Sequence, residues 1–137
     1  MSVDRDIRIA LSKHLFNTPG LPTVTSWEAG RTVKPVNGQV FIQEFILPAE
    51  TAPVSLGDND PNEYLGIYQV SVFVPDGYGA PAAMEEAGKI KSQFSRGTEL
   101  TESTSRVRID RMPSIGPAED NGAWWMYPVR IRYRVII

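Results

Sequence analysis

The sequence predicts an α+β domain in which one mostly antiparallel four-stranded sheet packs against two helices. Two segments repeat apolar residues at helical spacing, and four segments are rich in β-formers or alternate apolar with polar side chains. Along the chain these elements follow the order α-β-β-α-β-β. One helix separates two pairs of strands, so the regular strand–helix alternation of a parallel sheet is missing and an antiparallel sheet is expected.

The first helix is expected to begin after Ser2, a residue that caps helix N-termini, and to stop in the turn-rich segment 17–22. The second helix should begin near Pro81, which suits a first turn, and stop at Gly97. Gly88 inside that helix costs about 1 kcal/mol relative to alanine, which predicts close packing there. The apolar stripes are Ile7, Ala10, Leu11 and Leu15 in the first helix and Ala83, Ala87, Ile90 and Phe94 in the second.

The four strands are predicted from β-propensity and from alternation with a period of two residues. Segment 64–74 is the clearest central strand, because its valines recur at every second position and share one face with Tyr68. The predicted strands cover residues 39–47, 64–74, 106–111 and 127–137.

Composition narrows the chemistry that one domain over residues 1–137 can carry. The chain has no cysteine and one histidine, His14, which excludes thiolate nucleophiles and a two-histidine zinc site within one chain. His14 lies at helical spacing from Ile7, which favours a helix-face residue near the core over a catalytic one. The net charge of −2 and the lack of an apolar run of about 20 residues favour neither nucleic acid nor a membrane as partner. We therefore expect no enzymatic activity and no cofactor.

One glycine-rich turn imitates a nucleotide-binding motif. Gly77, Gly79 and Ala82 match G-x-G-x-x-A between a predicted strand and a predicted helix. The chain lacks the repeated strand–helix units of dinucleotide-binding folds, and Pro81 removes a backbone donor where phosphate would bind. A turn that glycine permits is the preferred interpretation.

One acidic segment imitates a calcium loop. Asp58, Asp60 and Asn62 match its first half, but Glu63 stands where the loop needs glycine and Gln69 where it needs glutamate. A solvated turn or an acidic contact segment is preferred to a metal site.

Five arginines alternate with apolar residues in the last two predicted strands. If these strands pair antiparallel in suitable register, all five lie on one face, where facing like charges need relief by acids, phosphate or solvent. Residues 102–137 carry six basic and four acidic side chains, whereas residues 1–101 carry eight basic and twelve acidic ones. Contact with an acidic segment of a neighbouring subunit, with DNA, or with solvent alone all remain open. The arginines are Arg106, Arg108, Arg130, Arg132 and Arg134, and the candidate acids are Asp58, Asp60 and Glu63.

Two adjacent tryptophans, Trp124 and Trp125, enter the last strand. Neighbouring residues of a strand point to opposite faces, so both are not expected in one core. One of them is a candidate anchor for a subunit contact, because tryptophan is enriched at interface hot spots.

These features together resemble the tail-terminator proteins of long-tailed phages. The resemblance runs through the segment Gly66–Val72, then Pro75 and the Gly77/Gly79 turn. It continues in the second helix at Ala87, Ile90 and Phe94, and its flanks hold Trp27, Trp125, Pro128, Val129 and Tyr133.

The resemblance implies a structural role without an active site. It implies a homo-oligomeric ring of six subunits, which ends the growing tail tube and contacts the major tail tube protein and the head-completion or neck protein. DNA would meet such a ring only by passing through its lumen. The subunit would act in the host cytoplasm during assembly and then in the virion tail, and a monomer in dilute solution is compatible with this. The alternatives are another neck or minor tail protein, and a nucleic-acid-binding module that uses the arginine face.

Overall fold

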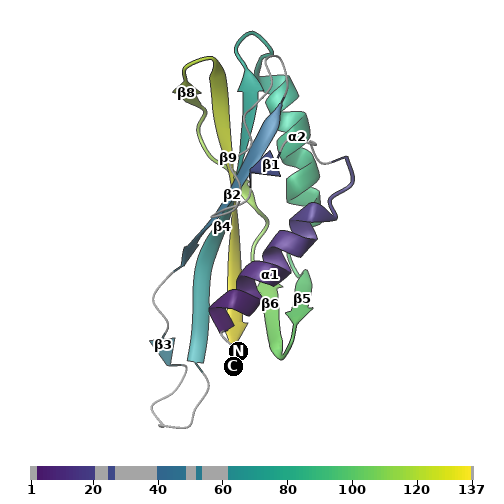
Figure 1. Ribbon diagram of the computed structural model, residues 1–137, viewed down its shortest axis with the longest axis vertical. Coiled ribbons are helices and arrows are strands. Elements are labelled where there is room, and N and C mark those ends of the chain that lie inside the picture. Colours follow the sequence, from purple (N-terminus) through teal and green to yellow (C-terminus); the bar gives the residue numbers. More distant parts are fainter. Residues whose placement is uncertain (1–2, 21–24, 27–39, 49–51, 54–61, 137) are drawn as a thin grey trace.

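The computed structural model describes residues 3–20, 25–26, 40–48, 52–53 and 62–136. Within these ranges two helices lie against a long, twisted sheet (Figure 1). The elements are α1 (Val3–Phe16), β1 (Thr25–Ser26), β2 (Phe41–Pro48), β3 (Ala52–Pro53), β4 (Asn62–Pro75), α2 (Ala80–Gln93), β5 (Glu99–Glu102), β6 (Ser105–Ile109), β7 (Ser114–Ile115), β8 (Glu119–Asn121) and β9 (Trp124–Ile136).

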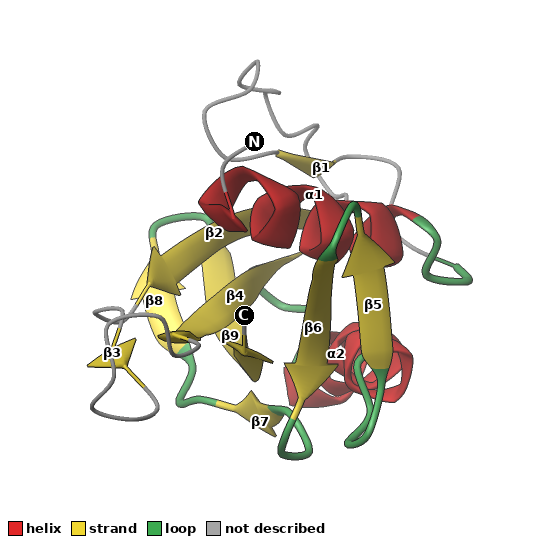
Figure 2. Ribbon diagram, turned by 90° about the horizontal axis from the view of Figure 1, so that it is seen from below, coloured by secondary structure: helices red, strands yellow, loops and turns green. Residues whose placement is uncertain are grey.

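The strands form one sheet with the order β1-β2-β4-β9-β6-β5, and β3 pairs with β4 while β7 and β8 pair with β9. The β1–β2 pair is parallel and the other pairs are antiparallel. Viewed along its length, the sheet curves so that α1 lies across β2 and the β5–β6 hairpin (Figure 2), while α2 packs against β4 and β9.

The α+β class and both helices are confirmed, but the prediction of a four-stranded sheet in the order α-β-β-α-β-β is wrong. The predicted strands are present as β2, β4, β6 and β9, and the described residues add five further strands to the sheet. The added strands hold two to four residues each, which is too short for a period of two to be recognised in the sequence.

The core lies between both helices and one face of the sheet. Inward-facing residues of β4, β6 and β9 meet the predicted stripes of α1 and α2 in a single buried cluster. The strand face that carries Tyr68 and the valines of β4 is fully buried, as the alternation predicted.

His14 joins the two helices. Its Nε2 donates a hydrogen bond to the backbone carbonyl of Gln93 over 2.6 Å. In return, the side-chain amide of Gln93 donates to the backbone carbonyl of His14 over 2.8 Å. The imidazole also meets the Phe94 ring edge-on, with 4.9 Å between centroids. These contacts give the histidine a packing role.

The second helix departs from its prediction in two details. It ends at Gln93, where the Phe94 amide donates to the Ile90 carbonyl, and Gly97 instead turns the chain into β5 with a φ of 90°. The predicted close packing at Gly88 is wrong, since a Cβ built on this residue meets nothing within 4 Å.

The central pair β4–β9 needs a glycine at one position. Gly66 lies opposite Tyr133, whose ring covers it, and a Cβ on Gly66 would come within 2.6 Å of the tyrosine Cζ. The ring therefore fills the space that a side chain would take.

A buried carboxylate lies under α1. Glu44 of β2 faces the core and is 2% exposed. It accepts hydrogen bonds from the Ser12 hydroxyl over 2.5 Å and the Tyr68 hydroxyl over 3.1 Å, and Arg8 approaches it to 3.9 Å. Because a buried charge must be paired and hydrogen-bonded, this network fixes α1 on the sheet. Burial raises the pKa of Tyr68 well above its ordinary value, and the Glu44 charge adds to the effect.

The glycines provide a test of the packing. Gly66→Ala should lower the free energy of unfolding by about 1–3 kcal/mol, because the Tyr133 ring must move. Gly88→Ala is the matched control and should raise it by about 0.5–1 kcal/mol, because the helix gains alanine without a clash. Urea denaturation measures both, and equal effects of the two substitutions would contradict the contact at Gly66.

The raised pKa of Tyr68 predicts a pH dependence. Above about pH 10 the unfolded chain loses the phenol proton while the folded protein keeps it, so the stability due to the neutral phenol falls as pH rises. Urea titrations between pH 9 and pH 11 (roughly one pH unit on either side of the ordinary tyrosine pKa) should show this fall. Tyr68→Phe should reduce this fall, although burial also raises the pKa of Tyr133 and part of the fall should therefore remain. Tyr78→Phe, at an exposed position, should leave the fall unchanged.

Candidate subunit interface

The outer face of the sheet, opposite the helices, carries the arginines of β9. Val129, Ile131 and Tyr133 are buried in the core, so the alternate residues Arg130 and Arg132 point outward and are exposed. Arg134 follows on the same face and is half-buried. The alternation of the last strand thus gives the orientation that the sequence predicted.

The arginines of β6 join this face. Arg108 lies directly opposite Arg134 in the β6–β9 ladder, and Arg106 follows two residues away on the same side of β6. All five predicted arginines therefore share the outer face. Facing like charges are destabilising, and two carboxylates lie nearby, with Asp110 at 3.9 Å from Arg108 and Glu99 at 4.0 Å from Arg106.

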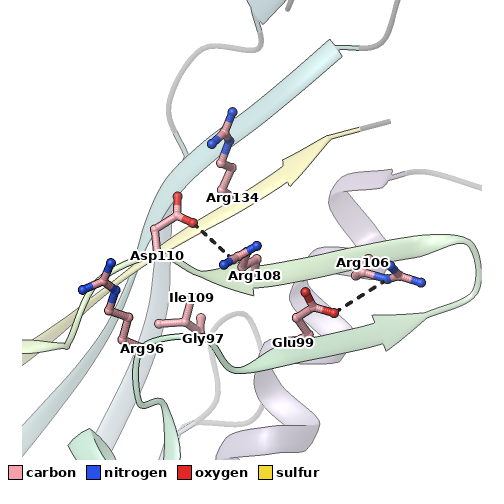
Figure 3. Close-up of a pocket in the computed structure, with 8 residues that line it drawn as sticks. All are labelled: Arg96, Gly97, Glu99, Arg106, Arg108, Ile109, Asp110 and Arg134. Atoms are coloured by element: carbon pink, nitrogen blue, oxygen red, sulfur yellow. Dashed lines mark ion pairs between the residues drawn. The ribbon is translucent and has the colours of Figure 1, made fainter.

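An open groove of about 700 Å³ is lined by Arg106, Arg108 and Arg134 (Figure 3). A fourth arginine, Arg96, lines the same groove. We call this the arginine groove, and its charged residues are Arg96, Arg106, Arg108, Arg134, Glu99 and Asp110. Arg96 comes from the loop after α2 and was missed in the sequence, because it belongs to no alternating pattern. The groove is lined by four arginines and only two carboxylates, so it favours a negatively charged partner.

The other two arginines lie farther along the outer face. Arg132 lines a neighbouring depression of about 450 Å³ with Arg111 and the exposed side chains of Leu47 and Leu65. Arg130 donates from Nε to the Gln69 amide oxygen over 3.4 Å. The five arginines thus form a row along one face and do not converge on one point.

The two tryptophans occupy opposite faces of β9, as predicted. Trp124 lies on the outer face and meets Phe41 edge-on at 5.6 Å between centroids, and Phe41 stacks on Phe73 at 4.4 Å. Trp125 lies on the helix side, is 37% exposed and donates from Nε1 to the Asp76 carboxylate over 3.1 Å. Trp124 therefore packs within the subunit, and of these two tryptophans Trp125 is the one available to a partner.

A small hollow of about 310 Å³ lies beside Trp125, where β4 turns into α2. We call it the Trp125 pocket. Its wall is mostly apolar, with one carboxylate, and is formed by Val74, Asp76, Gly77, Gly79, Ala80, Ala118, Trp125 and Tyr127.

The sequence profile of a family described as "Phage tail terminator protein" matches residues 6–133. The chain belongs to the phage tail terminator family. Members of this family are structural proteins of phage tails, so the resemblance predicted from the sequence is confirmed and a component of the virion tail is the supported class.

Two solved structures share the fold of this family member. One, whose name states no function, is 26% identical with a TM-score of 0.75, over 98% of this chain and 96% of that chain. The other is a chain of "Virion of native gene transfer agent (GTA) particle", 15% identical with a TM-score of 0.65, over 99% of this chain and 98% of that chain. No curated protein matches the chain.

Part of the predicted interface of this terminator-family chain lies beyond the described residues. Asp58 and Asp60 fall outside them. Glu63 is part of β4, but only its backbone is described. The pairing of the arginine face with these acids therefore stays a prediction.

The glycine motif is a turn in this family member. Gly77 and Gly79 adopt φ values of 96° and 83°, in the region that favours glycine, and they connect β4 to α2. Among the residues that the structure describes, no group of three metal-ligating side chains is found, and no helix is long and apolar enough to cross a membrane.

The different surroundings of the tryptophans predict different effects of their removal. Trp124→Ala should lower the free energy of unfolding by about 2–4 kcal/mol, because its contact with Phe41 is lost. Trp125→Ala should cost less than half as much, since Trp125 is more exposed and loses mainly one hydrogen bond. Chemical denaturation measures both, and a larger loss for Trp125→Ala would contradict the assignment.

Proposed function

We propose that this protein is the subunit of a homo-oligomeric ring that terminates the phage tail tube. Six subunits are the number that the family resemblance implies. The observation that carries the proposal is the family match, which spans nearly the whole domain. Its partners would be the major tail tube protein on one side of the ring and the head-completion or neck protein on the other.

The charge distribution supports contacts between unlike surfaces of identical subunits. Such heterologous contacts close into rings when the rotation between subunits permits. The row of arginines on the outer face suits acidic partners, because the guanidinium binds carboxylates through two parallel hydrogen bonds. An acidic surface of the next subunit would supply them, and segment 58–63 is one candidate.

The proposed place of action follows from the same family. The subunit would join the tail during assembly in the host cytoplasm and stay in the virion tail. DNA would pass through the lumen of the ring. The chemistry of the described residues gives no reason to add an enzymatic activity to this role.

The direct test is the length of tail tubes. Tubes assembled in cells from phage or prophage genes should have a uniform length when this protein is present and should exceed that length when its gene is deleted, as measured by electron microscopy. Expression of the gene from a plasmid should restore the normal length. Tubes of normal length in the deletion strain would refute the proposal.

A second candidate function is nucleic-acid binding through the arginine groove, which the excess of four arginines over two carboxylates favours. It predicts DNA binding whose affinity falls steeply as salt rises. Fluorescence anisotropy with duplex DNA at low salt tests it, and the absence of binding there would exclude it.

The proposal predicts that Arg132→Glu weakens self-association more than it weakens folding. Arg132 is exposed, so its substitution should change the free energy of unfolding by less than about 0.5 kcal/mol. Sedimentation under conditions where the wild type assembles should show about a tenfold loss of association.

Lys91→Glu, in α2, makes the same change of charge away from the outer face and is the control. Equal sedimentation of the wild type and Arg132→Glu would refute the part assigned to this arginine.

A further inference from the structure

We propose that the Trp125 pocket of one subunit receives an arginine side chain from the arginine groove of a second copy of the chain. This inference rests on the proposed ring and names the two surfaces that meet in it. The occupant is an arginine of an identical subunit, for which the pocket offers an aromatic face, the Asp76 carboxylate and an apolar floor, with a second carboxylate, Asp120, beside Trp125.

The aromatic face is held in place by a hydrogen bond within the subunit. Trp125 donates from Nε1 to Asp76 over 3.1 Å, which fixes the indole at the rim, where it is 37% exposed. A guanidinium stacks on an indole face and donates to a carboxylate at the same time. Asp76 uses one oxygen for Trp125 and keeps its second oxygen for such a donor.

A second carboxylate lies on the other flank of the indole. Asp120 is directly opposite Trp125 in the β8–β9 ladder, so the two side chains point to the same face, and Asp120 is exposed. Val74 is opposite Trp125 in the β4–β9 ladder and forms the inner wall. An incoming arginine would place its methylene groups along Val74 and Ala118 and its charge between two acids.

The N-terminus of α2 also lies at the pocket, but it does not reverse the preference of the pocket for a positively charged side chain. The helix dipole places roughly half a positive charge there. Asp76 and Asp120 each carry a full negative charge, so the site has a net negative field. Gly79, the N-cap of α2, adds no side chain that would fill the hollow.

The arginine groove can supply the incoming side chain. The side chains of Arg106 and Arg108 are 71% and 61% exposed, and their carboxylate neighbours lie at 4.0 and 3.9 Å, beyond hydrogen-bond length. Exposed pairs of this kind contribute little to stability, so exchanging them for contacts with a neighbour costs little.

The two surfaces lie toward opposite ends of the molecule. The β8 hairpin and the β4–α2 turn, which form the pocket, are at one end of the long axis, and the β5–β6 hairpin and the end of β9 lie toward the other (Figure 1). Because unlike surfaces lie at separate places on each subunit, their contact can repeat from copy to copy. That is the requirement for a heterologous ring.

Cross-linking through introduced cysteines tests the contact, because the chain contains none. One variant carries Ala118→Cys at the pocket and a second carries Glu99→Cys at the groove, and the two are mixed under conditions where the wild type forms rings, alone or on isolated tail tubes. We expect an oxidised heterodimer that neither variant forms by itself. Asn17→Cys, at an exposed position after α1, is the control and should cross-link to neither variant.

The outcomes separate this inference from the proposed ring. Wild-type rings without the heterodimer would overturn the inference and leave the ring intact. A cross-link from Glu99→Cys to Asp60→Cys in place of Ala118→Cys would overturn it in favour of segment 58–63. Failure of the wild type to form rings alone or on tubes would overturn the proposed function and this inference with it.

A charge exchange gives an independent measurement at two exposed positions. Asp120→Arg and Arg106→Asp should each weaken self-association by about tenfold in sedimentation, because each places like charges together. Mixing both variants, or combining them in one chain, should recover most of the loss. Additive losses without recovery would overturn the pairing of the two surfaces.

Discussion

The pairing of β4 with β9 is the constraint on which the rest of the structure depends. Thirteen residue pairs join these strands, and together they form the middle of the sheet. One face of the pair meets both helices, and the other exposes the arginines of β9. The same ladder ends beside Trp125 at the turn into α2. A one-residue change of register would exchange core and surface along the whole pair, so the ring of Tyr133 over Gly66 also helps to hold the outer face in place.

The long β4–β9 pairing and the chemistry of the surface residues are consistent with a structural role. Two of the buried residues that carry charge or titrate, Glu44 and Tyr68, are bonded to each other beneath α1. Among the surface charges, the four arginines of the arginine groove lie toward one end of the molecule, and Asp76 and Asp120 lie toward the other. Charges arranged in this way suit recognition between subunits better than proton transfer, which needs acids and bases placed together.

The sequence was informative where a pattern was long and uninformative where it was short. The alternation in β4 and β9 predicted both the strands and the orientation of Arg130 and Arg132, because eleven or more residues repeat the period. Strands such as β7, with two residues, have no period to detect.

The errors and omissions concern residues whose role depends on distant parts of the chain. Glu44 is polar within a predicted strand yet faces the core, since Ser12 and Tyr68 bond it there. Gly88 is not packed, and Arg96 joins the groove only because β5 and β6 fold back beside it. The faces of the two tryptophans could be separated from the sequence, but the one available to a partner could not.

The two edges of the sheet have a consequence for a protein that belongs to a family of tail terminators. Among the described residues, the sheet ends in β1 with two residues and in β5 with four, and β5 carries glutamates at both of its ends. Long apolar edges recruit further strands and lead to fibres, whereas the shortness of both edges and the glutamates of β5 discourage such growth. Contacts between subunits built this way would be made by side chains, which permits a finite assembly. In a member of this family, such edges would discourage the chain from forming an open-ended polymer of its own.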